Sequence, residues 1–377
     1  MFISDLAGSP SLEMVNLVLQ KIARGEKVIS LAIGEPVYNT PSEIIEVAYE
    51  SMKSGDTHYT SSYGTQEVRE AIVEKVKRKN KINASLENSI FITSKQSIYS
   101  TFMAIAGKRK KVLLPNPGYF YSEPAMLAGF SPVRYDLRDD LSLDAEKIAE
   151  KIDSDTAAII INTPGNPTGR VIDRGDLETI YEACRKKGVH IISDEAYEDL
   201  VYEKEHFSVG SLEDSPNVVI TIFSLSKSYS MTGWRAGYTI AREDIVTNIA
   251  RVIEHTYTCS PPFIQKASAY ALKNGQKFIE QFKNEFMKKR EYVKSRLEVM
   301  NGLSLRPIEG AFYAFPSYSK KKKSTEFSKE LLEMYGTAVL PGSAFGPAGE
   351  GHIRISFGGS MESIATGLDM LEKYLTS

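Results

Sequence analysis

A continuous apolar run, Ala157-Ala158-Ile159-Ile160-Ile161, constrains the fold of this chain more than any other stretch. A strand without polar alternation is typical of a sheet that is covered on both faces. Similar short runs lie at 90–92, 111–114, 189–193, 218–223 and 236–240. Segments with helical periodicity, such as 66–79 and 174–187, separate them. Strands that alternate with helices predict an α/β fold with a mostly parallel sheet between about residues 50 and 270.

The secondary structure expected at the two ends of the chain differs from the alternating strands and helices of its middle. A long charged helix is expected from Phe278 to Met300. Short strands are then expected at 311–315, 337–340 and 352–356, and helices at 325–335 and 361–375. We predict a three-layer large domain, residues 46–280, and a smaller α+β domain built from both chain ends. Residues 1–45, with a helix at 11–24 and a strand at 28–33, would form an N-terminal arm and part of that domain, and 281–377 the rest.

Composition and charge exclude several classes of protein. The 377 residues carry a net charge of −2, which gives no electrostatic footprint for nucleic acid. The two cysteines, Cys184 and Cys259, are far apart, so neither a disulfide scaffold nor a metal site is expected. No apolar run is long enough to cross a membrane, and no signal peptide is visible. We expect a soluble, cytoplasmic protein.

Polar residues collect where three successive expected strands end. Asn166 follows the first, Asp194 and Tyr197 the second, and Ser224 and Lys227 the third. Ligands of open α/β sheets bind at the carboxyl ends of strands. Each residue also has an ordinary interpretation, as part of a turn, a helix cap, a half-buried aromatic or a solvated loop. Their combination is what suggests a site.

Together these side chains suit pyridoxal phosphate. Burial lowers the pKa of a lysine, so Lys227 could form a Schiff base with the aldehyde. Asp194 would keep the ring nitrogen protonated, while Asn166 and Tyr197 would donate to the phenolic oxygen. The phosphate would be bound by hydroxyls, a backbone N–H and a guanidinium. The candidates for that role are Ser94, Lys95, Ser224, Ser226 and Arg235.

Two motifs carry a resemblance to a known family. They are Ser-Leu-Ser-Lys-Ser-Tyr-Ser-Met-Thr-Gly-Trp-Arg-Ala-Gly-Tyr at 224–238 and Asn-Thr-Pro-Gly-Asn-Pro-Thr-Gly at 162–169. With them, the chain resembles the class I/II pyridoxal-phosphate-dependent aminotransferases of fold type I, which include aspartate aminotransferase, over essentially its whole length. The resemblance implies that Lys227 binds the cofactor, that Asn166 contacts the phenolic oxygen, and that Asp194 and Tyr197 are the ring-nitrogen carboxylate and its companion.

The resemblance also implies substrate contacts and a partner subunit. Gly34 is similar to the glycine that closes over the substrate, Tyr119 to the aromatic residue stacked on the ring, and Arg354 to the arginine that clamps the substrate α-carboxylate. Asn166 would also face the substrate. Tyr59 is similar to the tyrosine that reaches the neighbouring subunit's phosphate, which implies a homodimer with shared active sites. The chain departs from the family at Thr93-Ser94-Lys95, where glycines are usual, and at Val37-Tyr38.

The expected activity is transfer of an amino group from an L-amino acid to a 2-oxo acid in a ping-pong cycle, with Lys227 as general base. Aspartate with 2-oxoglutarate is the favoured pair, on family frequency, with Lys95 as the cation for a second carboxylate. Aromatic or alanine-type donors would instead contact Tyr119, Tyr257 and Phe312. A β-lyase, a synthase making a cyclopropane amino acid, and a non-catalytic ligand-sensing module are the remaining alternatives.

Overall fold

The computed structural model describes residues 8 and 10–377. Its helices are α1 Pro10–Ala23, α2 Ser42–Lys53, α3 Gln66–Lys75, α4 Ser94–Ala104, α5 Ser122–Leu127, α6 Ala145–Lys151, α7 Arg174–Lys187, α8 Leu225–Ser228, α9 Glu243–Glu254, α10 Pro262–Asn274, α11 Gln276–Val299, α12 Ser324–Tyr335 and α13 Met361–Thr376. A π-helical turn, Val76–Asn80, continues α3.

One large sheet contains the strands β2 Ser89–Phe91, β3 Lys111–Asn116, β4 Ser131–Asp136, β5 Thr156–Asn162, β6 His190–Asp194, β7 Val219–Ser224 and β8 Gly237–Ile240. The seven strands lie in the order β2-β8-β7-β6-β5-β3-β4, and all of them run in one direction except β8. The predicted α/β fold with a mostly parallel sheet is therefore confirmed. Since β5, β6 and β7 are adjacent and parallel, their carboxyl ends meet at one edge.

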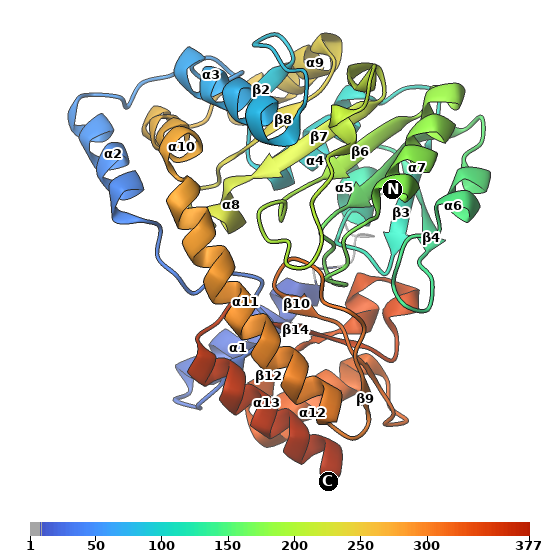
Figure 1. Ribbon diagram of the computed structural model, residues 1–377. Coiled ribbons are helices and arrows are strands. Elements are labelled where there is room, and N and C mark those ends of the chain that lie inside the picture. Colours follow the sequence, from blue (N-terminus) through green and yellow to red (C-terminus); the bar gives the residue numbers. More distant parts are fainter. Residues whose placement is uncertain (1–7, 9) are drawn as a thin grey trace.

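Helices cover both faces of this sheet because consecutive apolar residues of each strand point to opposite sides. Ile160 packs with residues of α4, α5 and α9 on one face. Its neighbours Ile159 and Ile161 pack with α6 and α7 on the other. Helices α3 and α10 extend that second layer over β7 and β8. Figure 1 shows these layers in the upper part of the molecule.

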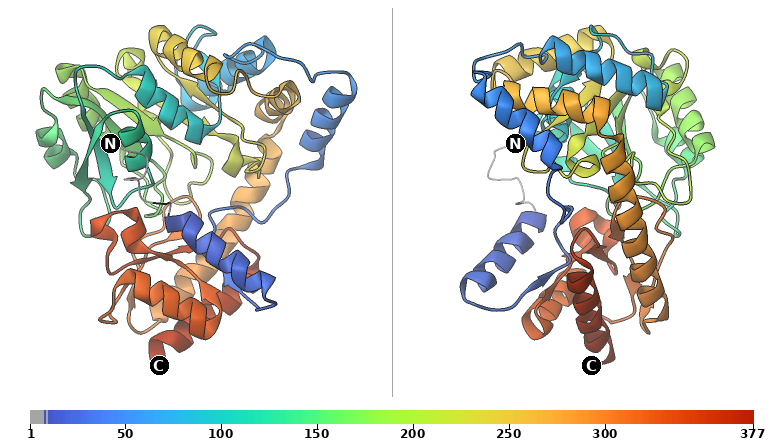
Figure 2. Two further views of the ribbon diagram at one scale, coloured as in Figure 1. Left: turned by 180° about the vertical axis from the view of Figure 1, so that it is seen from behind. Right: turned by 60° about the vertical axis from the view of Figure 1, so that its left-hand side comes forward.

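Short strands and helices form a smaller group below the large sheet, at the far end of the long α11 (Figure 1). These strands are β1 Ile29–Ser30, β9 Leu303–Ser304, β10 Tyr313–Ala314, β11 Ser317–Tyr318, β12 Thr337–Ala338, β13 Leu340–Pro341 and β14 Ile353–Ser356. β1 pairs in parallel with β12, so the N-terminal segment lies beside the C-terminal one. Figure 2 shows α1 next to this lower group from two sides. The boundaries at 45/46 and 280/281 stay a prediction.

Several local expectations differ from the structure. The strand expected at 28–33 is limited to Ile29–Ser30, and the one expected at 311–315 to Tyr313–Ala314. The run 337–340 divides into β12 and β13, which pair with different partners, β1 and β14. In this part of the chain the apolar residues are buried mainly by α11, α12 and α13 rather than by a wide sheet. Apolar runs therefore overstated the strand lengths.

None of the helices formed by the described residues, 8 and 10–377, combines the length and the apolar character that a membrane crossing requires.

Candidate active site

A cavity of about 270 Å³ lies where β5, β6 and β7 end. Nearly all residues that the sequence nominated line it: Gly34, Ser94, Lys95, Tyr119, Asn166, Asp194, Tyr197, Ser224, Ser226, Lys227, Arg235 and Arg354. Tyr59 does not line the cavity of its own chain, and 87% of this residue is exposed. Tyr257 and Phe312, expected as contacts for an aromatic substrate, do not line it either.

Lys227 lies on the short helix α8, which begins directly after β7. The hydroxyl of Ser224 caps this helix by accepting a hydrogen bond from the backbone N–H of Ser226 (3.2 Å). Lys227 Nζ donates to the carbonyl oxygen of Gly34 (2.6 Å). Burial lowers the pKa of Lys227 from 10.5 to about 8, because a charged amine is poorly solvated there. The lysine is thereby prepared to act as a neutral amine.

Asp194 is the last residue of β6 and is almost completely buried. Its Oδ2 accepts a hydrogen bond from the hydroxyl of Tyr121 (2.7 Å), and its Oδ1 accepts one from the backbone N–H of Ala196 (3.3 Å). Burial raises the pKa of Asp194 from 3.8 to about 6, although both hydrogen bonds act to lower it. Asp194 therefore presents a poorly solvated carboxylate to the cavity.

Arg354 lies on β14 and reaches the cavity from the lower group of strands. Its Nη1 donates to Asn166 Oδ1 (3.1 Å), and its Nη2 donates to the carbonyl oxygen of Ala32. The guanidinium also stacks over the ring of Tyr313 at 4.5 Å. Its buried Nε has no hydrogen-bond partner among the residues that the structure describes. Arg354 thus keeps donor capacity for a ligand.

The Tyr197 and Tyr313 hydroxyls share a hydrogen bond (2.7 Å) beside the loop of Gly34. An added Cβ at Gly34 would lie 2.3 Å from Tyr313 Oη, so this approach requires glycine. The close contact brings the Gly34 carbonyl within reach of Lys227. Segments from three distant parts of the chain are therefore packed around the lysine.

Hydroxyl, amide and guanidinium donors gather at the end of the cavity nearest α4. Ser94 is the first residue of α4, a helix start with unpaired backbone N–H groups that favour an anion. Arg235, in a left-handed backbone conformation (φ 58°), donates to Thr93 Oγ1 (3.1 Å) and to the carbonyl of Thr232 (2.7 Å). With Ser224 and Ser226 they form a donor set suited to phosphate.

Comparison with known proteins agrees with this geometry. Residues 26–371 match the family described as aminotransferase class I and II. The chain is 37% identical to an aromatic-amino-acid aminotransferase of Thermococcus litoralis and 37% identical to an aspartate aminotransferase of Pyrococcus abyssi, over 98% of both chains in each case. The solved structure of Thermus thermophilus aspartate aminotransferase with maleate superposes with a TM-score of 0.95 at 29% identity, covering 99% of this chain and 98% of that one.

The chain belongs to the class I/II aminotransferases. The resemblance inferred from the two motifs is confirmed, and so is the prediction of a pyridoxal-phosphate-dependent aminotransferase acting on an amino acid and a 2-oxo acid. The residues present fit the cofactor by their chemistry. The cavity supplies an amine, Lys227, a carboxylate, Asp194, and neutral donors from Asn166 and Tyr197, besides the donor set suited to phosphate.

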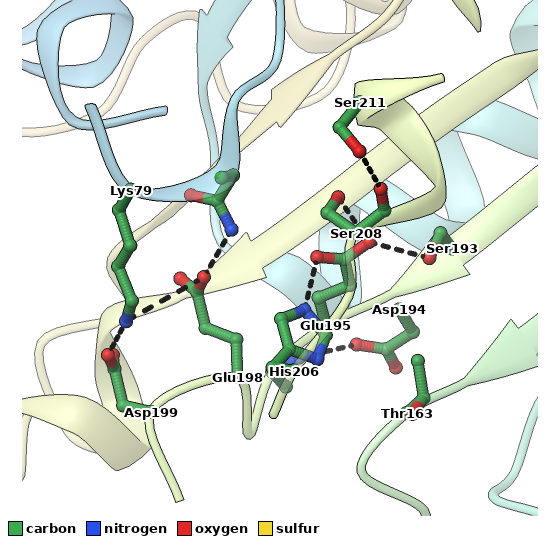
Figure 3. A network of polar contacts seen from close by, with 12 residues as sticks. Lys79, Thr163, Ser193, Asp194, Glu195, Glu198, Asp199, His206, Ser208 and Ser211 are labelled. Atoms are coloured by element: carbon green, nitrogen blue, oxygen red, sulfur yellow. Dashed lines mark hydrogen bonds and ion pairs between the residues drawn. The ribbon is translucent and has the colours of Figure 1, made fainter. Parts of the chain in front are cut away.

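A buried polar network lies next to Asp194 of this aminotransferase site (Figure 3). Glu195, next to Asp194, accepts hydrogen bonds from Ser193 and Ser208 (2.8 Å each) and contacts His206 Nε2 at 2.8 Å. Glu198 pairs with the buried amine of Lys75. Glu195, Glu198 and His206 lie close enough together to hold a cation, but every carboxylate is already engaged by protein donors. The group is therefore best described as a structural network.

The network also reaches α8, which carries the lysine. Asp199 pairs with Lys79, from the π-helical turn after α3, and accepts a hydrogen bond from the hydroxyl of Ser228. Because Ser228 directly follows Lys227, this contact ties α8 to the layer of helices behind it. The ion pairs thus help to fix the position from which Lys227 acts.

Some polar contacts of the site were not foreseen from the sequence, although the resemblance placed the segment that contains Tyr313 on the substrate side. Tyr121 donates to Asp194, and Tyr313 pairs with Tyr197. Asn162 Nδ2 donates to the backbone carbonyl of Asp194 (2.9 Å). Asn162 stood at a strand end, as did the nominated residues, so its position was a usable signal. Tyr121 had only its spacing of two from Tyr119, which is a weak one.

Proposed function

We propose that this aminotransferase transfers the amino group of aspartate to 2-oxoglutarate in a ping-pong cycle. The proposal is carried by two cationic side chains that line the cavity, Arg354 and Lys95. They are present in addition to Lys227 and Arg235, which are assigned to the cofactor. Two cations suit a substrate with two carboxylates. The aspartate aminotransferases among its relatives, one of them solved with the dicarboxylate maleate, support the same choice.

The residues divide the work according to their chemistry. Arg354 binds the α-carboxylate through its fork of N–H donors, and Lys95 the side-chain carboxylate. Lys227 Nζ, whose pKa is lowered by burial, takes the proton from Cα as general base. Asp194 is proposed to hold the protonated ring nitrogen. Bound pyridoxal phosphate supplies the aldehyde that carries the amino group and a ring that accepts the electrons of the Cα–H bond.

Two substitutions test these roles. Lys227→Ala is expected to abolish transamination, and appreciable turnover in that variant would refute the role of the lysine. Lys95→Met keeps the length of the side chain and removes its charge. It is expected to lower kcat/KM for aspartate by about tenfold or more while changing kcat/KM for alanine little. An equal loss for both donors would contradict the role of Lys95.

Aromatic donors are the second candidate. Tyr119 and Phe120 both line the cavity, and one relative is an aromatic-amino-acid aminotransferase. A panel of amino donors with 2-oxoglutarate decides between them. If only aromatic or alanine-type donors react, the aspartate proposal is wrong. Formation of pyruvate and ammonia without any added 2-oxo acid would instead indicate a β-lyase.

We also propose that the enzyme is a homodimer in which Tyr59 completes the partner's site. This tyrosine is 87% exposed on its own chain, which leaves it available to another one. Mixing Lys227→Ala subunits with Tyr59→Ala subunits tests the idea, because a hybrid dimer would have one site free of both changes. Activity above that of either variant is expected. No recovery, although hybrid dimers form, would contradict shared sites.

A further inference from the structure

Tyr121 is a buried residue whose polar group has no part in the reaction proposed above. Its side chain is completely buried and packs in the core beneath the sheet edge, with Ile98 and Phe102 among its neighbours. A phenol in such surroundings needs a hydrogen-bond partner, since leaving its hydroxyl unpaired costs free energy. The partner that it has is Asp194 Oδ2, at 2.7 Å.

The two hydrogen bonds on Asp194 leave part of its accepting capacity unused. An ionised carboxylate offers about four lone-pair sites. Tyr121 and the backbone N–H of Ala196 take one on each oxygen. Because a donor is attached to each oxygen, rotation of the carboxylate is restricted. Asp194 lines the cavity, so the remaining acceptor positions are available to a ligand there.

Tyr121 also contacts the other wall of the site. Its ring packs edge-on against Tyr119, with centroids 5.4 Å apart, and its backbone N–H donates to the Tyr119 carbonyl (2.8 Å). Tyr119 is the aromatic residue proposed to stack on the cofactor ring. One rigid side chain thus fixes both the residue proposed for the ring face and the carboxylate proposed for the ring nitrogen.

We propose that Tyr121 is a positioning residue, whose hydroxyl keeps the Asp194 carboxylate ionised and aimed at the protonated ring nitrogen of pyridoxal phosphate. The inference rests on the role proposed above for Asp194. Burial favours the neutral acid at this position, and the hydrogen bond from Tyr121 opposes that tendency. Without the phenol, the carboxylate loses a charge-assisted hydrogen bond and is ionised in a smaller fraction of the molecules, so fewer of them can pair with a cation.

The test compares two ligands that differ only at the ring nitrogen. They are pyridoxal phosphate and its deaza analogue, in which a C–H group replaces that nitrogen. The full-length protein is loaded with each compound, and dissociation constants are measured by equilibrium dialysis. Tyr121→Phe is expected to weaken binding of pyridoxal phosphate about tenfold and to change binding of the deaza analogue less than about threefold. The absorption of the bound cofactor should also shift towards that of an unprotonated ring.

Tyr135→Phe is the matched control. Tyr135 is equally buried, and its hydroxyl donates to the backbone carbonyl of Ile160 (2.7 Å) rather than to a carboxylate. This variant loses the same group from another buried tyrosine, and both compounds are expected to bind it with unchanged relative affinity. If Tyr121→Phe weakens both compounds equally, its role is packing alone and the inference is overturned.

Asp194→Asn separates failure of the inference from failure of the assignment beneath it. Asparagine keeps the shape of the side chain but cannot ionise. Asp194→Asn should therefore weaken binding of pyridoxal phosphate, relative to binding of the deaza analogue, more strongly than Tyr121→Phe does. No discrimination in Asp194→Asn would refute the ring-nitrogen role of Asp194, and the role of Tyr121 with it. Discrimination in Asp194→Asn without any in Tyr121→Phe would overturn the role of Tyr121 alone.

Discussion

Lys227 allows a quantitative test of how burial prepares the site. With its pKa lowered to about 8, about a tenth of the lysine is neutral at pH 7. An unperturbed lysine of pKa ~10.4 would be neutral in only about 0.04% of molecules at that pH. Burial therefore increases the neutral amine by roughly two orders of magnitude. The sign follows from the charge, because desolvation disfavours the cation and lowers the pKa.

Trace acetylation can measure this titration in the cofactor-free protein. The protein is exposed to a small amount of acetic anhydride between pH 6 and 11, and acetylation of the peptide containing Lys227 is measured by mass spectrometry. Free N-α-acetyl-lysine in the same tube corrects for the reagent, with its amine titrating near pH ~10.4. We expect labelling of Lys227 to rise about tenfold per pH unit below pH 7 and to level off above pH 9.

The result that would refute this reasoning is a midpoint at or above pH 10. The cavity would then solvate the ammonium as well as water does, and burial could not be the source of a reactive amine. Absence of labelling at every pH would indicate that the reagent does not reach the lysine. In that case ¹⁵N NMR of the lysine side chain gives the same midpoint without any reagent.

Two further predictions concern packing and buried charge. Glu198→Gln is expected to destabilise the holoenzyme by about 3 kcal/mol in urea unfolding, because it leaves the buried Lys75 amine without its counter-charge. The control Glu178→Gln, in an exposed ion pair, should cost at most about 0.5 kcal/mol. Equal effects of the two variants would contradict the role of the buried charge. The pKa of Glu198 is lowered from 4.5 to about 2, so the stabilisation by its ionised carboxylate is complete above about pH 5 and is lost as the pH falls towards 2. Gly34→Ala should destabilise the protein by about 1–3 kcal/mol in the same assay, because the added Cβ would overlap Tyr313 Oη. Adding Tyr313→Phe to this variant should restore most of the lost stability. No recovery would mean that the overlap is not the cause.

The sequence was sufficient where the signal is local. The inner residues of β5, β6 and β7 are mostly apolar and buried because both faces are covered, and each strand ends in a polar residue that lines the cavity, Asn162, Asp194 or Ser224. A run of apolar residues and the residue after it are adjacent in the chain. Their meeting at one edge then follows from parallel pairing alone.

The parts that were missed depend on contacts between distant segments. The hydrogen bond from Tyr121 to Asp194 joins residues 73 positions apart in the chain, and no local sequence pattern predicts it. The two-residue strands of the lower group are too short to give an alternation. Helix α9 is different, because Ile245, Ile249 and Ile253 recur at helical spacing and are buried together. That signal was available in the sequence and was not used.

The contrast between two buried arginines supports the role proposed for Arg354. Both Arg290 and Arg354 are 3% exposed, so both guanidinium groups have lost most of their water. Arg290 is compensated within the protein, since it pairs with the carboxylates of Glu203 and Glu291. In the described part of the chain Arg354 pairs with no carboxylate and donates only to neutral oxygens. A buried cation without a counter-charge is costly, and its cost falls when an anion binds. Arg290 therefore belongs to the scaffold, whereas the missing negative charge at Arg354 is the one that a substrate carboxylate would bring.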